Sequence, residues 1–125
     1  DSSTLYVSMY TSGIVRKIDV ESQEVSAFAD GFSQPWGIAL APDDSYMLVC
    51  EYNYDRIEKV TIPGAVKSIL AGGGSSGTLS GFFDIPGTSA LFYRPSGIAI
   101  DFDGIYAYVA DTYNFRIRRI TISTG

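Results

Sequence analysis

Residues 95–117 read PSGIAIDFDGIYAYVADTYNFRI, and two earlier stretches of the chain follow the same pattern. The matching segments are PWGIAL at 35–40, LVCE at 48–51 and RIEKV at 56–60 in one copy, and YVSM at 6–9 and IVRKI at 14–18 in the other. The interval from the valine to the last aliphatic residue is 11 positions in all three copies: Val7 to Ile18, Val49 to Val60 and Val109 to Ile120. A constant interval of this kind identifies an internal repeat.

The spacing between the copies sets the size of the repeated unit. Val49 follows Val7 by 42 residues, and Val109 follows Val49 by 60 residues. A period near 42 accommodates four strands of about five or six residues with their turns, which is one blade of a β-propeller. The second interval is 18 residues longer, so it predicts an insert between two blades.

Short runs of β-branched and aromatic residues, bounded by Gly, Pro, Asp, Asn or Ser, predict an all-β chain without a substantial helix. The expected strands are 5–9, 15–20, 25–29, 37–41, 46–51, 57–62, 67–71, 97–101, 107–111 and 117–122. They make a propeller segment of four-stranded antiparallel blades, one complete and two incomplete. The expected boundaries are 1–34, 35–72 and 95–125 for the blades and 72–94 for the insert. Propellers need at least about four blades, so we expect closure through further chain or association of copies.

Two segments of the third copy resemble the NHL repeat family. Pro95 to Asp101 looks like that family's P-x-G-I-A-x-D, and Tyr108 to Ile117 looks like Y-V-A-D-T-x-N-x-R-I. The second copy departs from this pattern at Glu51 and Tyr54, and the first at Met9 and Ile14. The resemblance implies a propeller whose members are mostly interaction modules that bind protein, in some cases RNA, and act in some cases as extracellular or sensor domains. A minority of related propellers, the lactonases and amidating lyases, are enzymes.

Polar residues between the strands are predicted to shape turns. Asp111 and Asn114 suit a tight connection between the second and third strands of a blade, because both side chains bond to nearby backbone groups. Arg116 is placed to make a charge-assisted bond to Asp111 or to the neighbouring blade. Turn formation, rather than Ca²⁺ binding, is also the expected role of Asp43, Asp44, Asp101 and Asp103.

The residue types argue against an enzyme in this segment. The chain has no histidine, so Ser-His-Asp and Cys-His arrangements are excluded, and no ligand cluster resembles the metal centres of the related enzymes. The single cysteine, Cys50, lies in an apolar run and is predicted to be a buried structural thiol. The run from Gly72 to Gly77 lacks the lysine of a phosphate loop and is interpreted as a flexible crossover. We therefore predict no catalytic residue, no metal and no cofactor.

Charge and hydropathy restrict the partners. Nine Lys and Arg residues against 14 Asp and Glu residues give a net charge of −5, which opposes binding to nucleic acid. Arg116, Arg118 and Arg119 form the one basic spot, but Arg116 and Arg118 share one face of a strand and Arg119 takes the other. The apolar stretches are too short to span a bilayer, so membrane insertion is not expected.

Strand direction predicts the binding face. With the strands of a blade named a to d from the propeller axis outward, the b-to-c turns and the d-to-a crossovers gather on one face. That face collects the insert and an aromatic-rich set of turn residues, and loops on a rigid scaffold concentrate function. The candidate partner-binding residues are Tyr10, Tyr52, Asn53, Tyr54, Tyr113, Phe115, Phe82 and Phe83. Trp36, just before a strand a, is expected to wedge between blades.

The leading hypothesis is therefore a non-catalytic binding or structural scaffold module. Its expected partners are proteins or glycans, other propeller segments or copies of itself. One alternative is that the chain is part of a propeller enzyme related to lactonases or amidating lyases, with catalytic residues outside this segment. A further alternative is an RNA-binding NHL domain. The sequence does not identify a compartment, although the resemblance slightly favours an extracellular or cell-surface location.

Overall fold

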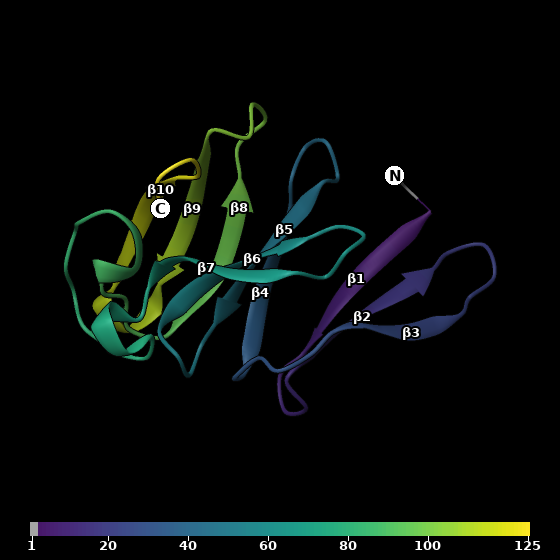
Figure 1. Ribbon diagram of the computed structural model, residues 1–125, viewed down its shortest axis with the longest axis horizontal. Coiled ribbons are helices and arrows are strands. Elements are labelled where there is room, and N and C mark those ends of the chain that lie inside the picture. Colours follow the sequence, from purple (N-terminus) through teal and green to yellow (C-terminus); the bar gives the residue numbers. More distant parts are fainter. Residues whose placement is uncertain (1–2) are drawn as a thin grey trace.

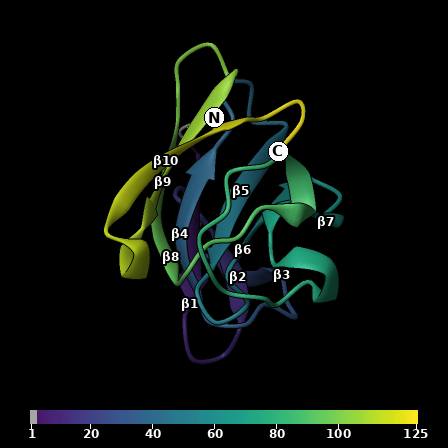
Figure 2. The ribbon, with the colours of Figure 1, turned by 90° about the vertical axis from the view of Figure 1, so that its left-hand side faces the viewer.

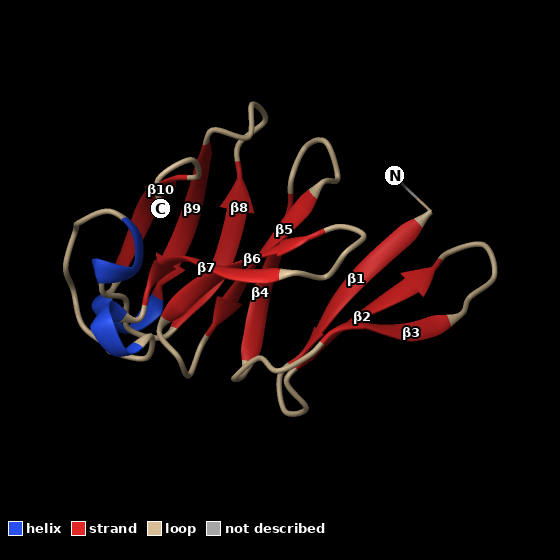
Figure 3. Ribbon diagram, in the orientation of Figure 1, coloured by secondary structure: helices blue, strands red, loops and turns tan. Residues whose placement is uncertain are grey.

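The repeat folds into three antiparallel sheets that stand side by side in a computed structural model, which describes residues 3–125 (Figure 1, Figure 3). The first sheet contains β1 (Thr4–Met9), β2 (Ile14–Asp19) and β3 (Val25–Ala29). The second contains β4 (Pro35–Leu40), β5 (Tyr46–Glu51), β6 (Arg56–Thr61) and β7 (Lys67–Gly72). The third contains β8 (Pro95–Ile100), β9 (Tyr106–Asp111) and β10 (Arg116–Thr121). Helical structure in the described residues is limited to three short 3-10 turns, Gly74–Ser76, Gly87–Ser89 and Thr112–Asn114.

Each sheet is a meander in which consecutive strands pair, and β4 packs beside both β1 and β8. The ten strands, in sheets of three, four and three, confirm the predicted propeller segment with one complete and two incomplete blades. Several strands start one or two residues before their predicted positions. The reason is that the ladders already begin at Pro35, Arg56, Pro95 and Arg116, which pair with the end of the neighbouring strand or turn.

Strand β5 explains why the middle blade is apolar on both faces. Its side chains alternate, so Met47 and Val49 pack toward the first sheet while Leu48 and Cys50 pack toward the third. All four side chains are fully buried. One core therefore lies on each side of the middle blade, and the predicted burial of Cys50 is confirmed.

The outer sheets each keep one apolar face uncovered. Val15, Ile57 and Ile117 occupy the same repeat position on β2, β6 and β10. The first two are 0% exposed because the next blade packs on them, whereas Ile117 is 71% exposed. Leu5, Val7 and Met9 are exposed on β1 at the opposite end of the row. The three blades thus form an open row rather than a closed ring.

The insert packs against the outer strands of two blades instead of hanging free. Figure 2 views the molecule from the side on which this segment lies, next to β7 and β10. Within the insert, the β-bridge Gly73↔Leu79 closes a first loop and the β-bridge Phe83↔Leu91 closes a second. Phe92 is buried in the core between the second and third sheets. Gly73 has a φ of 82°, and a Cβ there would lie 2.5 Å from the carbonyl oxygen of Gly77. The glycine-rich run is therefore a tight turn.

We expect native Cys50 to react with a disulfide reagent at least ~100-fold more slowly than in denaturant, because labelling of a buried thiol requires local opening of the fold. Burial also raises the pKa of the Cys50 thiol, which further suppresses the reactive thiolate. The measurement is the rate of colour release from 5,5′-dithiobis(2-nitrobenzoate), with the same protein in guanidinium chloride as the control. Rapid native labelling would contradict the packing of β5.

Candidate functional site

Buried carboxylates at the ends of β5 and β9, the b strands of the second and third blades, fix the face on which the b-to-c turns and the crossovers meet. Glu51 and Asp111, the last residues of β5 and β9, are both 0% exposed. Glu51 Oε1 accepts a hydrogen bond from the backbone N–H of Ser33 at 2.8 Å, and Asp111 Oδ1 accepts one from Tyr93 N–H at 2.7 Å. These N–H groups belong to the segments that lead into β4 and β8. Each carboxylate thus anchors the crossover into its own blade.

A third carboxylate ties the middle blade to the third. Asp55 Oδ1 accepts the backbone N–H of Arg94 at 2.6 Å, across the boundary between the two blades. Burial raises the pKa of Asp55, and the hydrogen bond from Arg94 opposes that change. The backbone that precedes β8 is consequently held at both Tyr93 and Arg94.

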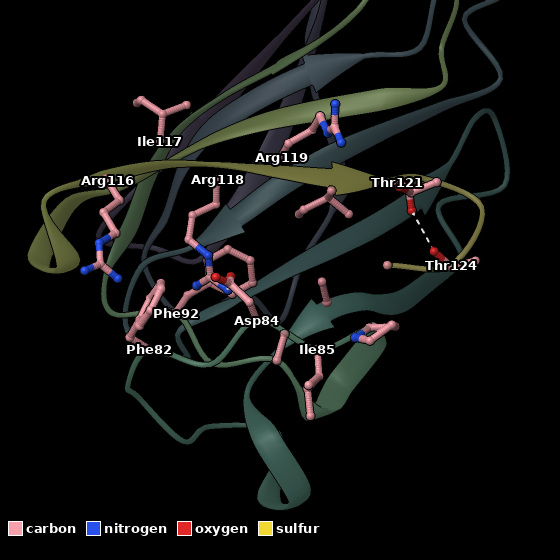
Figure 4. A pocket seen from close by; sticks show the side chains of 15 residues that line it. Phe82, Asp84, Ile85, Phe92, Arg116, Ile117, Arg118, Arg119, Thr121 and Thr124 are labelled. Atoms are coloured by element: carbon pink, nitrogen blue, oxygen red, sulfur yellow. Dashed lines mark hydrogen bonds and ion pairs between the residues drawn. The ribbon is translucent and has the colours of Figure 1, made fainter.

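Two arginines neutralise the buried carboxylates and clamp the insert. Arg118 Nη1 lies 3.0 Å from Asp111 Oδ2, and its Nη2 lies 2.5 Å from Asp84 Oδ1 (Figure 4). The same guanidinium donates to the carbonyl oxygens of Leu91 at 2.6 Å and Phe83 at 3.0 Å, so it fixes both ends of the loop from Phe83 to Leu91.

Arg56 plays the corresponding part in the middle blade. Its Nε pairs with Glu51, its Nη2 donates to Glu58 Oε1 at 2.8 Å, and its Nη1 donates to the carbonyl oxygen of Gly77 at 3.1 Å. Gly77 lies at the start of the insert, so the two arginines hold its opposite ends.

The prediction for Arg116 was wrong. Arg116 is exposed and stacks over the Phe82 ring at 3.8 Å, while Asp111 pairs with Arg118 two residues later. Arg116 and Arg118 are two residues apart and share one face of β10, where both contact the Phe82 ring of the insert, but only the Arg118 guanidinium reaches Asp111. The prediction for Asn114 was correct, since its Nδ2 donates to Asp111 Oδ2 at 2.8 Å.

Five aromatic rings form a continuous row across all three blades on this face, which we call the aromatic row. Its neighbouring ring centroids are 5.3 Å apart for Tyr10–Trp36, 5.1 Å for Trp36–Tyr52, 6.3 Å for Tyr52–Tyr113 and 5.1 Å for Tyr113–Tyr93. Two of these four ring pairs are edge-to-face, at interplanar angles of 80° and 78°, and the other two are tilted by 38° and 49°, arrangements that are favourable for aromatic contacts.

Arg94 lies in the middle of the aromatic row. Its guanidinium is 5.1 Å from the Tyr52 ring centroid and 4.9 Å from that of Tyr113, and its Nη1 donates to the Tyr52 hydroxyl at 3.4 Å. The hydrogen bond from Arg94 lowers the pKa of Tyr52, while the hydrogen bond with Tyr52 raises the pKa of Tyr113. The row therefore combines apolar ring surface with one cation and phenolic hydroxyls.

Trp36 lies between Tyr10 and Tyr52 of the first two blades, as a wedge between blades would, but its ring is not buried. Its side chain is 52% exposed and, with Ser8, Tyr10 and Pro35, lines a shallow depression of about 490 Å³ at one end of the row. Its backbone is nevertheless fixed, because Ser8 Oγ donates to the Trp36 carbonyl oxygen at 2.6 Å. Trp36 is thus a ring held on the surface between the first two blades.

The eight predicted partner-binding residues lie in three different places: the aromatic row, the insert and the turns. Tyr10, Tyr52 and Tyr113 belong to the aromatic row. Phe82 and Phe83 lie in the insert instead, where Phe82 packs beneath Arg116 and the Phe83 carbonyl accepts from Arg118.

The remaining three serve or flank turns. Tyr54 contacts the Arg56 guanidinium at 4.8 Å, and Asn53 Nδ2 donates to Ser33 Oγ at 3.0 Å. Phe115 is 92% exposed and makes no contact with the row that the structure records within residues 3–125.

Trp36, Tyr93 and Arg94 belong to the site but were not predicted there. A usable signal exists, because all three lie within two residues of the proline that opens a strand a. Gln34 and Arg94 occupy the same position before that proline and share a left-handed backbone, with φ of 53° and 54°.

A cavity of about 560 Å³ lies between the insert and β10 (Figure 4). Phe82, Asp84 and Phe92 line it from the insert side. In the other two blades, strand d pairs with strand c at this place, as β7 does with β6. Within residues 3–125, no strand pairs with the outer edge of β10, so the cavity belongs to a strand position rather than to a ligand site.

Asp43 and Asp101 shape turns as predicted. Asp43 Oδ1 accepts from Ser45 Oγ at 2.6 Å, and Asp101 Oδ1 accepts from the N–H groups of Ile105 and Tyr106 at 2.8 and 3.0 Å. In the part of the chain that the structure describes, no three His, Cys, Asp or Glu side chains gather as metal ligands would. Over the same residues there is no helix long and apolar enough to cross a membrane.

Sequence comparison finds relatives among curated proteins, although no protein-family model matches the chain. Human NHL repeat-containing protein 2 is 32% identical over 99 residues, which is 75% of this chain and 14% of that protein. Protein SUPPRESSOR OF QUENCHING 1, chloroplastic, from Arabidopsis thaliana is 23% identical over 138 residues, or 97% of this chain and 13% of that protein. The chain thus spans 13–14% of the length of these relatives.

Solved structures share the fold at low identity. An auxiliary nutrient binding protein from Bacteroides thetaiotaomicron matches with a TM-score of 0.77 and 20% identity, over 94% of this chain and 34% of that one. Virginiamycin B lyase from Staphylococcus aureus matches with a TM-score of 0.69 and 16% identity, over 100% of this chain and 36% of that one. At these identities the likeness establishes the architecture alone.

Replacing Arg118 with Met should lower the free energy of unfolding by about 3–5 kcal/mol, because Asp111 would remain buried without its cation. Arg116→Met is the matched control on the same strand and should lower it by less than about 1 kcal/mol, since only an exposed ring contact is lost. Urea denaturation of the full protein measures both. Equal losses would show that Arg118 does not hold the insert.

The free energy of unfolding of the Glu58→Gln variant, taken relative to that of the unaltered protein, should increase as pH rises. Burial, followed by the charge of Glu51, raises the pKa of Glu58. Within residues 3–125, Glu58 Oε2 has no hydrogen-bond partner, and Lys67 Nζ lies 3.6 Å from it. The native state therefore binds this proton more tightly than the unfolded state, so the contribution of Glu58 to stability falls as pH rises from its ordinary pKa of 4.5 through its native pKa. Urea denaturation of both proteins at pH 4.5 and 7.5 tests the difference; a pH-independent difference would contradict it.

Proposed function

The chain belongs to the NHL-repeat β-propeller family, and on that basis we propose that it is a non-catalytic recognition module that binds a partner protein through the aromatic row. The observation that carries this proposal is the continuity of the row across three blades. Tyr and Trp give large contact areas with little loss of side-chain entropy, and they dominate the energetics of many interfaces.

The construction of the face supports the same proposal. Ser33, Tyr93 and Arg94 are held by buried carboxylates through their backbone N–H groups, so the segments that carry the rings are fixed before any partner arrives. Preorganisation of this kind lowers the entropic cost of association. The rings themselves remain available, since Tyr10, Trp36, Tyr93 and Tyr113 are all exposed.

Glycan recognition is the second candidate, and the exposed Trp36 ring beside the depression of about 490 Å³ is what favours it. The steep tilt of two of the four neighbouring ring pairs favours protein instead. The interplanar angle is 80° for Tyr10–Trp36 and 78° for Tyr52–Tyr113, so the row presents notches rather than one flat platform. Notches accept side chains, whereas a sugar ring stacks on an open aromatic face.

A display library of random 12-residue peptides and an array of free glycans, both applied to the full protein, test the proposal. We expect peptides to bind, and we expect the double variant Trp36→Ala/Tyr52→Ala to weaken them by at least about 2 kcal/mol, the magnitude of an interface hot spot. Phe115→Ala is the matched control, because it removes an exposed ring outside the row. Failure of both collections to bind, or equal binding to the double variant, would refute recognition through this face.

A further inference from the structure

We propose that the aromatic row receives an extended acidic segment of a partner protein, with an Asp or Glu carboxylate of that segment paired to the guanidinium of Arg94. This inference rests on the proposed recognition function and specifies the chemistry of the partner. It follows from the unused hydrogen-bond donors of the Arg94 guanidinium, the spacing of the rings in the aromatic row and the net charge of the chain.

Unlike Arg56 and Arg118, Arg94 has no carboxylate partner for its side chain within residues 3–125. Arg56 pairs with two glutamates and Arg118 with two aspartates. Among residues 3–125, the guanidinium of Arg94 makes one hydrogen bond, to the Tyr52 hydroxyl at 3.4 Å, and two ring contacts. Asp55, bonded to Arg94, accepts its backbone N–H and forms no ion pair with its side chain. Most of the five N–H donors are therefore available.

The surroundings of Arg94 suit a carboxylate. The Tyr52 and Tyr113 rings restrict the guanidinium from two sides, and its planar fork matches two carboxylate oxygens. The phenolic hydroxyls add donors near the same point. Because the side chain is partly buried, an incoming carboxylate would meet it in a site with less competing water.

The spacing of the row fits an extended peptide. The Tyr52 centroid is 6.1 Å from that of Tyr10 and 6.3 Å from that of Tyr113. Alternate side chains of an extended chain recur on one face about every 6.6 Å, twice the rise per residue. A carboxylate at Arg94 would thus place the side chains two positions away over neighbouring notches, and the depression beside Trp36 would receive an apolar residue at the end.

The net charge limits how the partner is attracted. The chain carries −5 overall, so its long-range field does not draw in an acidic segment. The attraction is local to Arg94, which predicts the modest salt dependence of a single partly buried pair rather than the steep dependence of a basic patch.

The test uses peptides selected from the random 12-residue library on the full protein. We expect the selected peptides to share an Asp or Glu, and we expect its replacement by Asn or Gln to weaken binding by about 10- to 100-fold, as for a hydrogen-bonded charge. Arg94→Gln should cause the same loss and should bind the original and neutralised peptides equally. Glutamine is suited to this position, because Gln34 adopts the same left-handed backbone at the same place in the preceding crossover.

Arg119→Gln is the matched control, since Arg119 also stacks on a tyrosine, Tyr106, at 4.5 Å but lies on β10 away from the row. It should leave affinity unchanged. If peptides bind through the aromatic row and the Arg94→Gln variant binds them with unchanged affinity, the acidic-segment proposal is wrong and the recognition function still stands. Binding by glycans alone would overturn it as well, and the absence of any binding would overturn both.

Discussion

The buried carboxylate at the end of strand b is the interaction on which the rest of the face depends. Glu51 and Asp111 are fully enclosed, and each receives the backbone N–H of the segment that leads into its own blade. A charge in such a position is strongly destabilising unless it is paired and hydrogen-bonded, and the pairing requires an arginine in each case. The carboxylate therefore forces the turn, the crossover and a cation to meet at one place. The aromatic row is built on the backbone that results.

The same requirement explains how the insert is held. Arg56 and Arg118 occupy different repeat positions, because Arg118 aligns with Glu58 and Arg116 aligns with Arg56. Either position can deliver a guanidinium to the buried carboxylate, and the remaining donors then fall on carbonyl groups of the insert. An irregular segment with many backbone carbonyls is thereby satisfied without pairing into a sheet. Phe92 completes the attachment by entering the core between two blades.

The sequence predicts the features that are set locally and misses those set by contacts between segments. Strand positions follow from alternation, breakers and a constant repeat interval, so all ten strands were expected within one or two residues. The face that carries Tyr10, Tyr52 and Tyr113 follows from strand direction. The choice of Arg118 over Arg116 does not follow, because both side chains lie on the same face of β10 and the choice depends on how the insert packs along that strand. The exposure of Trp36 was missed because its ring lies between Tyr10 and Tyr52, on the b-to-c turns of two neighbouring blades, and no local pattern reports that approach.

The groups that hold the backbone of this face are separate from the side chains that would contact a ligand. Gln34 and Arg94 stand at one repeat position with nearly identical φ, yet one side chain is neutral and the other is a cation between two rings. The backbone at this position is fixed by neighbouring carboxylates, through Ser33 in one crossover and through Tyr93 and Arg94 in the other. Its side chain carries none of that anchoring. Substitution there can consequently alter what the face recognises while the hydrogen bonds that hold the crossovers remain intact.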